Sequence, residues 1–343
     1  MSRRTLTQLL ATVLAVGLTV VGFVAPVPYV SLEPGPTFNT LGDDHGRPVL
    51  AITGHTTRRT TGHLDLTTVG VRADLSLGEA LLGWFSRTRA VVPRELVFAP
   101  NLTDQQQQQQ NTHDMVASQN SATTAALGEL GLYQAEVSVA QVSAGAPADG
   151  VLKPNDVLVS VDGHKINNRT ELTRMITAHT IGDTVAIGYR RDGKAHIARL
   201  VTVAAHDDGP VRPVIGVLTR EAGKKYLATV SISLTDVGGP SAGLMFALGI
   251  MDKLGTVELT GGRYIAGTGE ITDAGNVNPI GGITQKLLGA RGNGATVFLV
   301  PKDNCKEAAQ NRPSGMQLIQ VTSLHDALVQ LRLLRDGGTP RPC

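Results

Sequence analysis

The chain begins with an apolar segment that is long enough to cross a lipid bilayer. Residues 9–27 contain no charged side chain. In a helix, about 20 residues span the ~30 Å hydrocarbon layer of a membrane. A secretory signal has a shorter apolar region followed by a cleavage site between small residues. Here the nearest candidate, Ala25, is followed by Pro26. The segment therefore favours an uncleaved anchor over a cleaved signal peptide, and the lipid bilayer is an expected partner of residues 9–27.

The charges that flank this segment predict its orientation. Arg3 and Arg4 precede it, and acidic residues from Glu33 onward follow it. Positively charged residues stay on the cytoplasmic side of a membrane. We therefore expect residues 1–30 to form a cytoplasmic stub and a single-pass transmembrane anchor. The rest of the chain, with any catalytic part, is expected outside the cytoplasm.

The composition describes a globular protein of about two domains attached to that anchor. Of the 343 residues, 41% are apolar, and the formal net charge is +2. No basic stripe with interleaved aromatic residues occurs, which argues against nucleic-acid binding. The two cysteines, Cys305 and Cys343, lack metal-ligand spacing, and the sequence indicates neither a metal nor another cofactor. A disulfide between them stays open, because we expect residues 338–343 to form a flexible tail.

Residues 31–126 show a mixed pattern of short strands and helices. The pattern around residues 49–52 and 62–69 predicts strands, and residues 76–85 predict a helix. The glutamine-rich stretch 104–114 is typical of a solvated loop or a helix extension rather than of a functional tract. We expect the early strands to complete the sheet of the last domain, around an inserted module.

Residues 127–205 change to a β-rich pattern with one helix and an Asp-Gly hairpin turn. This stretch resembles a PDZ domain of bacterial proteases, whose pattern is followed by Ala146-Pro147-Ala148, Asn155-Asp156 and Val161-Asp162-Gly163. The resemblance implies a PDZ-like module that binds extended peptides as an added strand, or one that only spaces its neighbours. Gly131-Leu132-Tyr133 is the candidate peptide-binding loop.

The stretch VGGPSAG, Val237 to Gly243, joins an alternating segment to a long apolar run. Ser241 is therefore expected where a half-buried strand turns into the first turn of a buried helix. Unpaired N–H groups at a helix start suit the stabilisation of an oxyanion. Two other interpretations stay open. In one, Ser241 only caps the helix. In the other, G-x-S-x-G is the nucleophile elbow of an α/β-hydrolase-like esterase that uses His325 as its base.

Lys286 is the candidate base for Ser241. Gly281 and Gly282 break the chain, and Lys286 then falls in the first turn of a helical pattern. The dipole of a helix disfavours a cation at this end, and burial lowers the pKa of a lysine further. A neutral amine accepts the proton of a serine hydroxyl. Because a lone lysine is more often a solvated charge, this role depends on the wider pattern.

That wider pattern resembles the proteolytic domain of Lon-type serine–lysine peptidases. GGPSAG is followed by TGEI and then by PIGGITQK, whose lysine lies 45 residues after the serine (286 − 241 = 45). The resemblance implies an α+β, ribosomal-protein-S5-domain-2-like fold over residues 206–337. It also implies Ser241 as the nucleophile, Lys286 as the general base and Thr268 as a residue that positions the amine. The supporting residues are Gly239, Pro240 and Ala242.

The order of the parts resembles the membrane-anchored PDZ–Lon proteases of Gram-positive and related bacteria. The chain contains no G-x-x-x-x-G-K-[ST] pattern, which marks nucleotide-binding modules. The resemblance implies an ATP-independent endopeptidase of exported or membrane proteins, whose PDZ module takes substrate tails or regulates cleavage. The competing interpretation is a catalytically inert PDZ scaffold. Assembly into a homo-oligomer is left open.

Overall fold

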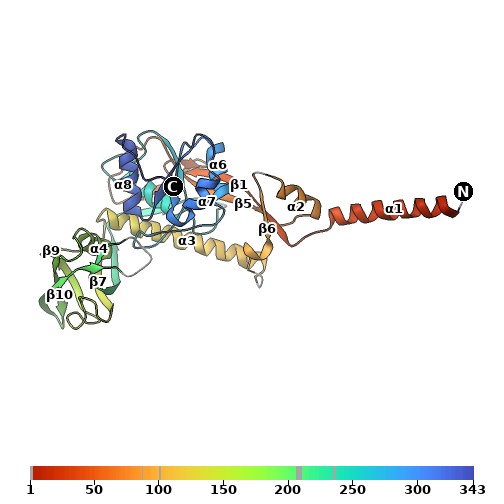
Figure 1. The fold of residues 1–343 in the computed structure, drawn as a ribbon. Helices are drawn as coiled ribbons and strands as arrows, with labels where there is room; N and C mark the ends of the chain where they lie inside the picture. The colour runs from red at the N-terminus through yellow and green to blue at the C-terminus, as the bar shows by residue number, and fades with distance from the viewer. Residues whose placement is uncertain (1–2, 87, 100–101, 206–210, 235–236) are drawn as a thin grey trace.

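The computed structural model describes residues 3–86, 88–99, 102–205, 211–234 and 237–343. It shows an α+β protein with a projecting N-terminal helix, a central body and a smaller β-rich module (Figure 1). The projecting helix, α1 (Arg3–Val24), buries none of its apolar window inside the protein. By length and composition it is able to cross a membrane.

A six-stranded sheet forms the central body, in the order β20-β19-β16-β5-β1-β6. Its strands are β1 (Tyr29–Asn39), β5 (His63–Arg72), β6 (Ala90–Pro93), β16 (Tyr264–Gly267), β19 (Val297–Pro301) and β20 (Gln317–Val321). The strands β5, β16, β19 and β20 run parallel, and β1 pairs antiparallel with both β5 and β6. The early strands of the chain therefore lie in one sheet with strands of its last third.

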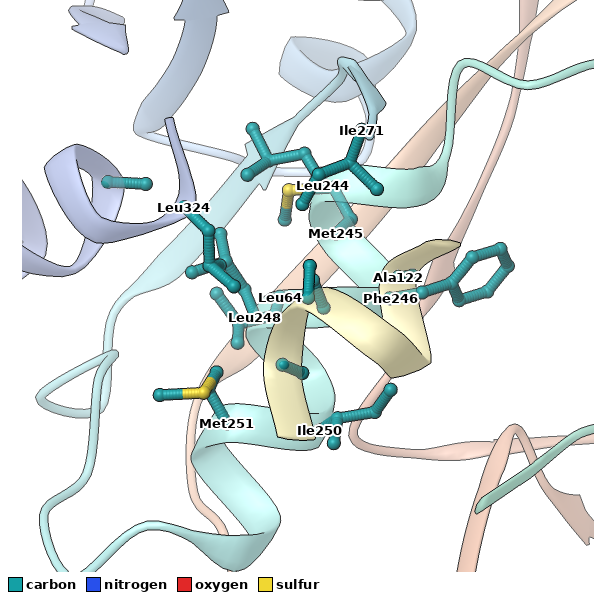
Figure 2. Packing of buried hydrophobic residues seen from close by; sticks show 14 of the residues in the cluster. Leu64, Ala122, Leu244, Met245, Phe246, Leu248, Ile250, Met251, Ile271 and Leu324 are labelled. Atoms are coloured by element: carbon teal, nitrogen blue, oxygen red, sulfur yellow. The ribbon is translucent and has the colours of Figure 1, made fainter. Parts of the chain in front are cut away.

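Helices cover both faces of this sheet. One face carries α3 (Asp104–Glu129), α5 (Gly243–Leu254) and α8 (Leu324–Arg335), and the other carries α6 (Ile283–Gly292) and α7 (Cys305–Gln310). Neighbouring residues of a strand point to opposite faces, so Ile265 belongs to one apolar core and Ala266 to the other. Figure 2 shows Leu248 of α5 in the same cluster as Leu64 of β5 and Leu324 of α8.

The smaller module is a second sheet with a core of its own, in the order β11-β10-β8-β7-β14. Its strands are β7 (Tyr133–Val142), β8 (Val157–Val161), β10 (Thr184–Arg191), β11 (Lys194–Val201) and β14 (Val217–Tyr226), and α4 (Arg169–Thr177) packs against them. The strand β14 lies beyond the expected boundary at residue 205, because it pairs with β7 and not with the sheet of the body. The chain then returns to the body through β15 (Thr229–Ile232), which pairs with β4 (Leu50–Thr53).

The helix α3 joins the two parts of the molecule (Figure 1). Its first half is the glutamine-rich stretch, which begins with a capping box between Thr103 and Gln106. Its second half enters the core of the body through Ala122, Ala125 and Ala126. Only three residues separate the end of this helix from β7, so α3 leads directly from the body into the smaller module.

The C-terminal tail is fixed, which corrects the expectation that residues 338–343 are flexible. A disulfide joins Cys343 to Cys305 of α7. The backbone N–H of Gln320 in β20 donates to the carbonyl of Arg341 at 3.0 Å. The sequence around Cys343 does not reveal this position, because the tail is held by β20 and α7, whose place next to it is known only from the fold. The tail therefore lies along the outer edge of β20.

The remaining elements are short, apart from α2. They are α2 (Leu77–Trp84), η1 (Arg94–Leu96), η2 (Lys302–Asn304), β2 (Asp43–Asp44), β3 (Arg47–Pro48), β9 (His164–Lys165), β12 (Val203–Ala204), β13 (Pro213–Val214), β17 (Glu270–Ile271) and β18 (Val277–Asn278).

Candidate active site

The loop that carries Ser241 ends one residue before the helix cap. The helix α5 begins at Gly243, and its N-cap is Ala242, which forms no side-chain capping hydrogen bond. Gly239 turns the chain with a φ of +82°, a conformation that side chains rarely adopt. Ser241 therefore precedes the cap position instead of occupying it or the first turn. Its hydroxyl is not engaged in capping α5, and the interpretation of Ser241 as an ordinary N-cap is wrong.

Two contacts from α3 hold this loop in place. The N–H of Gly239 donates to the carbonyl of Asn111 at 2.9 Å. The hydroxyl of Ser118, which is buried, donates to the carbonyl of Pro240 at 2.8 Å. Sequence reasoning missed both α3 residues, because they lie more than a hundred positions from the loop. Their polar surroundings in the sequence gave no signal that one of them is buried.

Lys286 lies within hydrogen-bond distance of Ser241. Its Nζ is 2.7 Å from Ser241 Oγ, and the lysine is only 3% exposed. The residue stands in the first turn of α6, which follows Gly282 in a left-handed conformation with a φ of +67°. A Cβ at Gly282 would lie 2.8 Å from a methyl group of Val69, so a glycine is needed for this close approach to β5. Burial lowers the pKa of Lys286 to about 7.

Thr268 connects the lysine to the serine loop. Its side chain is fully buried just after β16. The hydroxyl donates to the carbonyl of Ser241 at 3.0 Å and accepts from Lys286 Nζ at 2.9 Å. Because the threonine proton is committed to that carbonyl, the lysine must donate an N–H to Thr268. A neutral amine then directs its lone pair toward Ser241 Oγ.

Two backbone N–H groups next to the serine are free to receive an anion. The N–H of Leu244 already donates to Gly269, and that of Gly243 donates to Pro240. Within the part of the chain that the structure describes, the N–H groups of Ser241 and Ala242 donate to no protein atom. They lie at the positive end of the α5 dipole, which suits an oxyanion.

A cavity of about 380 Å³ opens beside Ser241 and Lys286. Segments β1, β5 and the serine loop line it, and apart from Lys286 every lining side chain is uncharged. The lining residues are Pro36, Phe38, Thr67, Thr68, Val69, Gly70, Val237, Gly238, Ser241, Ala242, Gly281 and Lys286. Among the described lining residues, Lys286 is therefore the titratable group, and it lies next to the Ser241 hydroxyl in an otherwise uncharged pocket.

His325 does not take part in this arrangement. It lies near the start of α8 with 62% of its side chain exposed, and its Nδ1 is 2.7 Å from Glu129. The titratable group that the fold brings to Ser241 is Lys286. The hydrolase-like interpretation with a histidine base is therefore not supported by the geometry.

The candidate peptide-binding loop, Gly131-Leu132-Tyr133, has a different structural role. The N–H groups of Gly131 and Leu132 bond to carbonyls of α3, so this turn ends the helix. The side chain of Tyr133 is 1% exposed, and its hydroxyl donates to Glu221 at 2.9 Å. The N–H groups of Gly131 and Leu132 are therefore not available to a peptide carboxylate, which corrects the sequence-based assignment.

Comparisons with known proteins agree with this picture. Residues 233–333 match the Lon protease (S16) C-terminal proteolytic domain, and residues 107–201 match the PDZ domain. The Lon protease of Azospirillum brasilense is 39% identical over 97 residues, which are 27% of this chain and 12% of that protein. Lon protease 3 of Sorangium cellulosum is 35% identical over 102 residues, which are 29% of this chain and 12% of that protein. The chain thus spans about 12% of the length of these curated relatives.

Among solved structures, two PDZ domains of SdrC-like proteins from Listeria align with part of the chain. That of Listeria monocytogenes is 30% identical with a TM-score of 0.23, and covers 24% of this chain and 86% of that one. That of Listeria innocua is 30% identical with a TM-score of 0.24, and covers 26% of this chain and 97% of that one.

The fold, the site and the matched families define a serine-type endopeptidase domain combined with a PDZ domain. More specifically, residues 233–333 form a Lon-type proteolytic domain, and the chain carries one N-terminal apolar helix ahead of both domains.

Proposed function

We propose that this protein is a membrane-anchored endopeptidase that cleaves peptide bonds with a dyad of Ser241 and Lys286. The observation that carries the proposal is the 2.7 Å distance between Lys286 Nζ and Ser241 Oγ. Burial of the lysine makes proton transfer over this distance possible, because a pKa of about 7 leaves much of the amine neutral at physiological pH. No acidic partner is needed to orient this base, because Thr268 accepts one of its N–H groups.

The reaction begins when Ser241 attacks the carbonyl carbon of the scissile peptide bond. Lys286 Nζ accepts the hydroxyl proton, and the N–H groups of Ser241 and Ala242 stabilise the negative oxygen of the tetrahedral intermediate. The ammonium of Lys286 then returns a proton to the leaving amine. A water molecule, deprotonated by the same amine, releases the acyl group and restores the serine.

The location of the reaction follows from α1. Arg3 and Arg4 precede the apolar helix, so the positive-inside rule favours a cytoplasmic N-terminus and an extracytoplasmic protease. The disulfide between Cys305 and Cys343 favours the same side, because disulfides persist in oxidising compartments. Substrates would then be exported or membrane proteins, cleaved without ATP, and the PDZ domain would bind their tails or regulate access.

The dyad is tested on the full chain in detergent or nanodiscs, with an unstructured protein such as casein as substrate. Ser241→Ala and Lys286→Ala should each abolish cleavage, and a fluorophosphonate should add its mass to Ser241 in the unaltered protein but not in these two variants. Lys253→Ala is the matched control, because Lys253 is half-buried on α5 and its Nζ bonds to the Leu50 carbonyl instead of Ser241. An inert scaffold predicts no adduct and no cleavage in any of them.

The cellular part of the proposal needs separate measurements. Cells that carry Ser241→Ala should accumulate a set of exported or membrane proteins that cells with the unaltered protein degrade. Protease added outside spheroplasts should digest the catalytic domain if the predicted orientation holds. Digestion only after the cells are opened would contradict the orientation and leave the dyad chemistry untouched.

A further inference from the structure

The helix α2 exposes its large apolar side chains and buries its small residues. The small residues Gly78, Ala80 and Gly83 are buried, Gly83 against Val91 of β6 and Gly78 beneath Phe23 of α1. The large residues point outward, and their exposed fractions are 37% for Leu77, 37% for Leu81, 68% for Leu82, 53% for Trp84 and 88% for Phe85. A surface helix of a soluble protein shows the opposite pattern, with its apolar stripe turned to the core. The outer face of α2 is therefore suited to an apolar environment.

This apolar face begins where α1 ends. The ring of Phe23 in the last turn of α1 packs so closely on Gly78 that a Cβ there would lie 2.1 Å from it. On a helix of 3.6 residues per turn, Gly78 lies between Leu82 and Phe85, so α1 contacts the exposed face of α2 itself. Figure 1 shows α2 at the end of α1 that joins the body.

The connection between the two helices is short and hydrogen-bonded. The N–H of Leu77 donates to the carbonyl of Ala25 at 2.9 Å, and the N–H of Val27 donates to the carbonyl of Leu75 at 3.0 Å. The ring of Trp84 also stacks edge-on against Tyr29, the first residue of β1, with ring centroids 5.7 Å apart. The position of α2 is thus fixed relative to the last turn of α1.

The length of α1 then sets the depth of α2. Its 22 residues extend about 33 Å, close to the ~30 Å hydrocarbon layer of a bilayer. If Arg3 and Arg4 stay in the cytoplasm, Val24 reaches the outer boundary of that layer. A helix of about 10 Å diameter that touches Phe23 must then lie in the headgroup region. Tryptophan is enriched at this level of membranes.

We propose that α2 and Phe85 form a lipid-binding collar that docks the protease onto the outer leaflet of the membrane that α1 spans. The proposal rests on the proposed anchoring of α1 and adds a second contact with lipid. The occupant is the lipid surface, because the apolar face is continuous with the anchor. Among the described charges beside α2, Arg72 pairs with Glu79 and Arg89 with Glu33, so apolar side chains make most of the contact and salt should weaken it little.

The test uses Trp84, which is the only tryptophan of the chain. The full chain is placed in nanodiscs made with ordinary lipid or with lipid brominated near the top of its acyl chains. The proposal predicts blue-shifted Trp84 emission in ordinary lipid and its loss in brominated lipid, at low and at high salt. The matched control is Trp84→Phe combined with Ile197→Trp, which moves the reporter to a 75% exposed position on β11 of the far module. This reporter should stay unquenched.

A second variant, Leu82→Ser with Phe85→Ser, alters only exposed side chains and should weaken the quenching of Trp84 while α1 stays inserted. Insertion of α1 is measured separately, by resistance to carbonate extraction. If α1 is inserted but Trp84 is not quenched, the collar proposal is wrong and the anchor proposal is unaffected. If the emission is then still blue-shifted, the apolar face contacts a second protein copy in place of lipid. Quenching of both reporters equally also overturns the collar. Failure of α1 to insert overturns the anchor and the collar together.

Discussion

Raising the pH from 6 to 8 should increase the rate of Ser241 acylation about tenfold. The reaction needs the neutral amine of Lys286, and burial lowers the pKa of that amine to about 7. At a pKa of about 7, roughly 9% of the amine is neutral at pH 6 and roughly 91% at pH 8. A lysine with an ordinary pKa would instead give a rate that keeps rising past pH 10.

The assay measures kcat/KM with an unstructured fluorogenic substrate, which reports the ionisation of the free enzyme. The rate of fluorophosphonate labelling at Ser241 is measured in parallel, because it depends on the serine and its base without any peptide-binding step. Both profiles should have their midpoint near pH 7. Lys253→Ala should leave the midpoint unchanged, since Lys253 lies away from Ser241.

A flat profile between pH 6 and 9 in both measurements would refute the role of Lys286 as base. A profile that survives in Lys286→Ala with the same midpoint would assign the titration to a different group. A midpoint near pH 10 would show that the lysine is hydrated in solution, and the burial argument would then fail.

Three further perturbations test the structure around the site. Lys286→Met should stabilise the fold by about 4 kcal/mol at pH 7 in urea unfolding, because the unfolded lysine is fully protonated there, whereas the folded one, with its pKa of about 7, binds the proton only about half of the time. For the same reason the stability of the unaltered protein should rise between about pH 7 and 10, and this rise should vanish in the variant. Ser118→Ala should lower kcat about fivefold with KM nearly unchanged, because a hydrogen bond worth ~1 kcal/mol to Pro240 is lost. Cys305→Ser with Cys343→Ser should cost up to about 4 kcal/mol and lower Tm, since the disulfide closes a separation of 38 residues.

Each of these has a control or an opposite outcome. Thr123→Ala also removes a hydroxyl from α3, but that hydroxyl bonds only within the helix, so kcat should not change. Equal losses in the Ser118 and Thr123 variants would mean that general helix stability, and not the serine loop, matters. A Lys286→Met substitution that destabilises the protein would show that the amine makes net favourable contacts, contrary to the burial argument. An unchanged Tm in the cysteine variant would leave the tail held by backbone contacts alone.

The chemical groups of the site could be found from the sequence because each stands in a short local pattern. Ser241 lies in a glycine-containing loop just before a buried helix, although β15 ends at Ile232 and not next to the serine as expected, and Lys286 follows a glycine pair at a helix start. The structure brings both to one cavity, and the buried Thr268 hydrogen-bonds to Lys286. The contribution of α3 could not be predicted, because Asn111 and Ser118 bond to residues more than a hundred positions away. In addition, the glutamine-rich part of their helix has the pattern of a solvated segment. Local patterns therefore reveal the reacting groups but not what positions them.

The C-terminal boundary of the smaller module could not be predicted from the sequence either, because it depends on pairing between distant strands. The strand β14 contains no fully buried residue, only half-buried and exposed ones, and it carries several charges, which is typical of an edge strand. Its assignment to a sheet depends on pairing with β7, which begins about 80 residues earlier. Gly131 likewise suits both a binding loop and a helix end, and only the partners of its N–H group decide between them.

The parallel pairing of β5 with β16 joins residues about 200 positions apart, from His63 with Tyr264 to Leu66 with Gly267. Until the last third of the chain has been synthesised, β5 lacks its neighbour β16, and the cavity lacks Ser241 and Lys286, which belong to that same third. Contacts between such distant segments also form slowly. A protease of the proposed kind would therefore stay inactive while its own chain is being made, and it would be able to cut other proteins only once the whole polypeptide has folded.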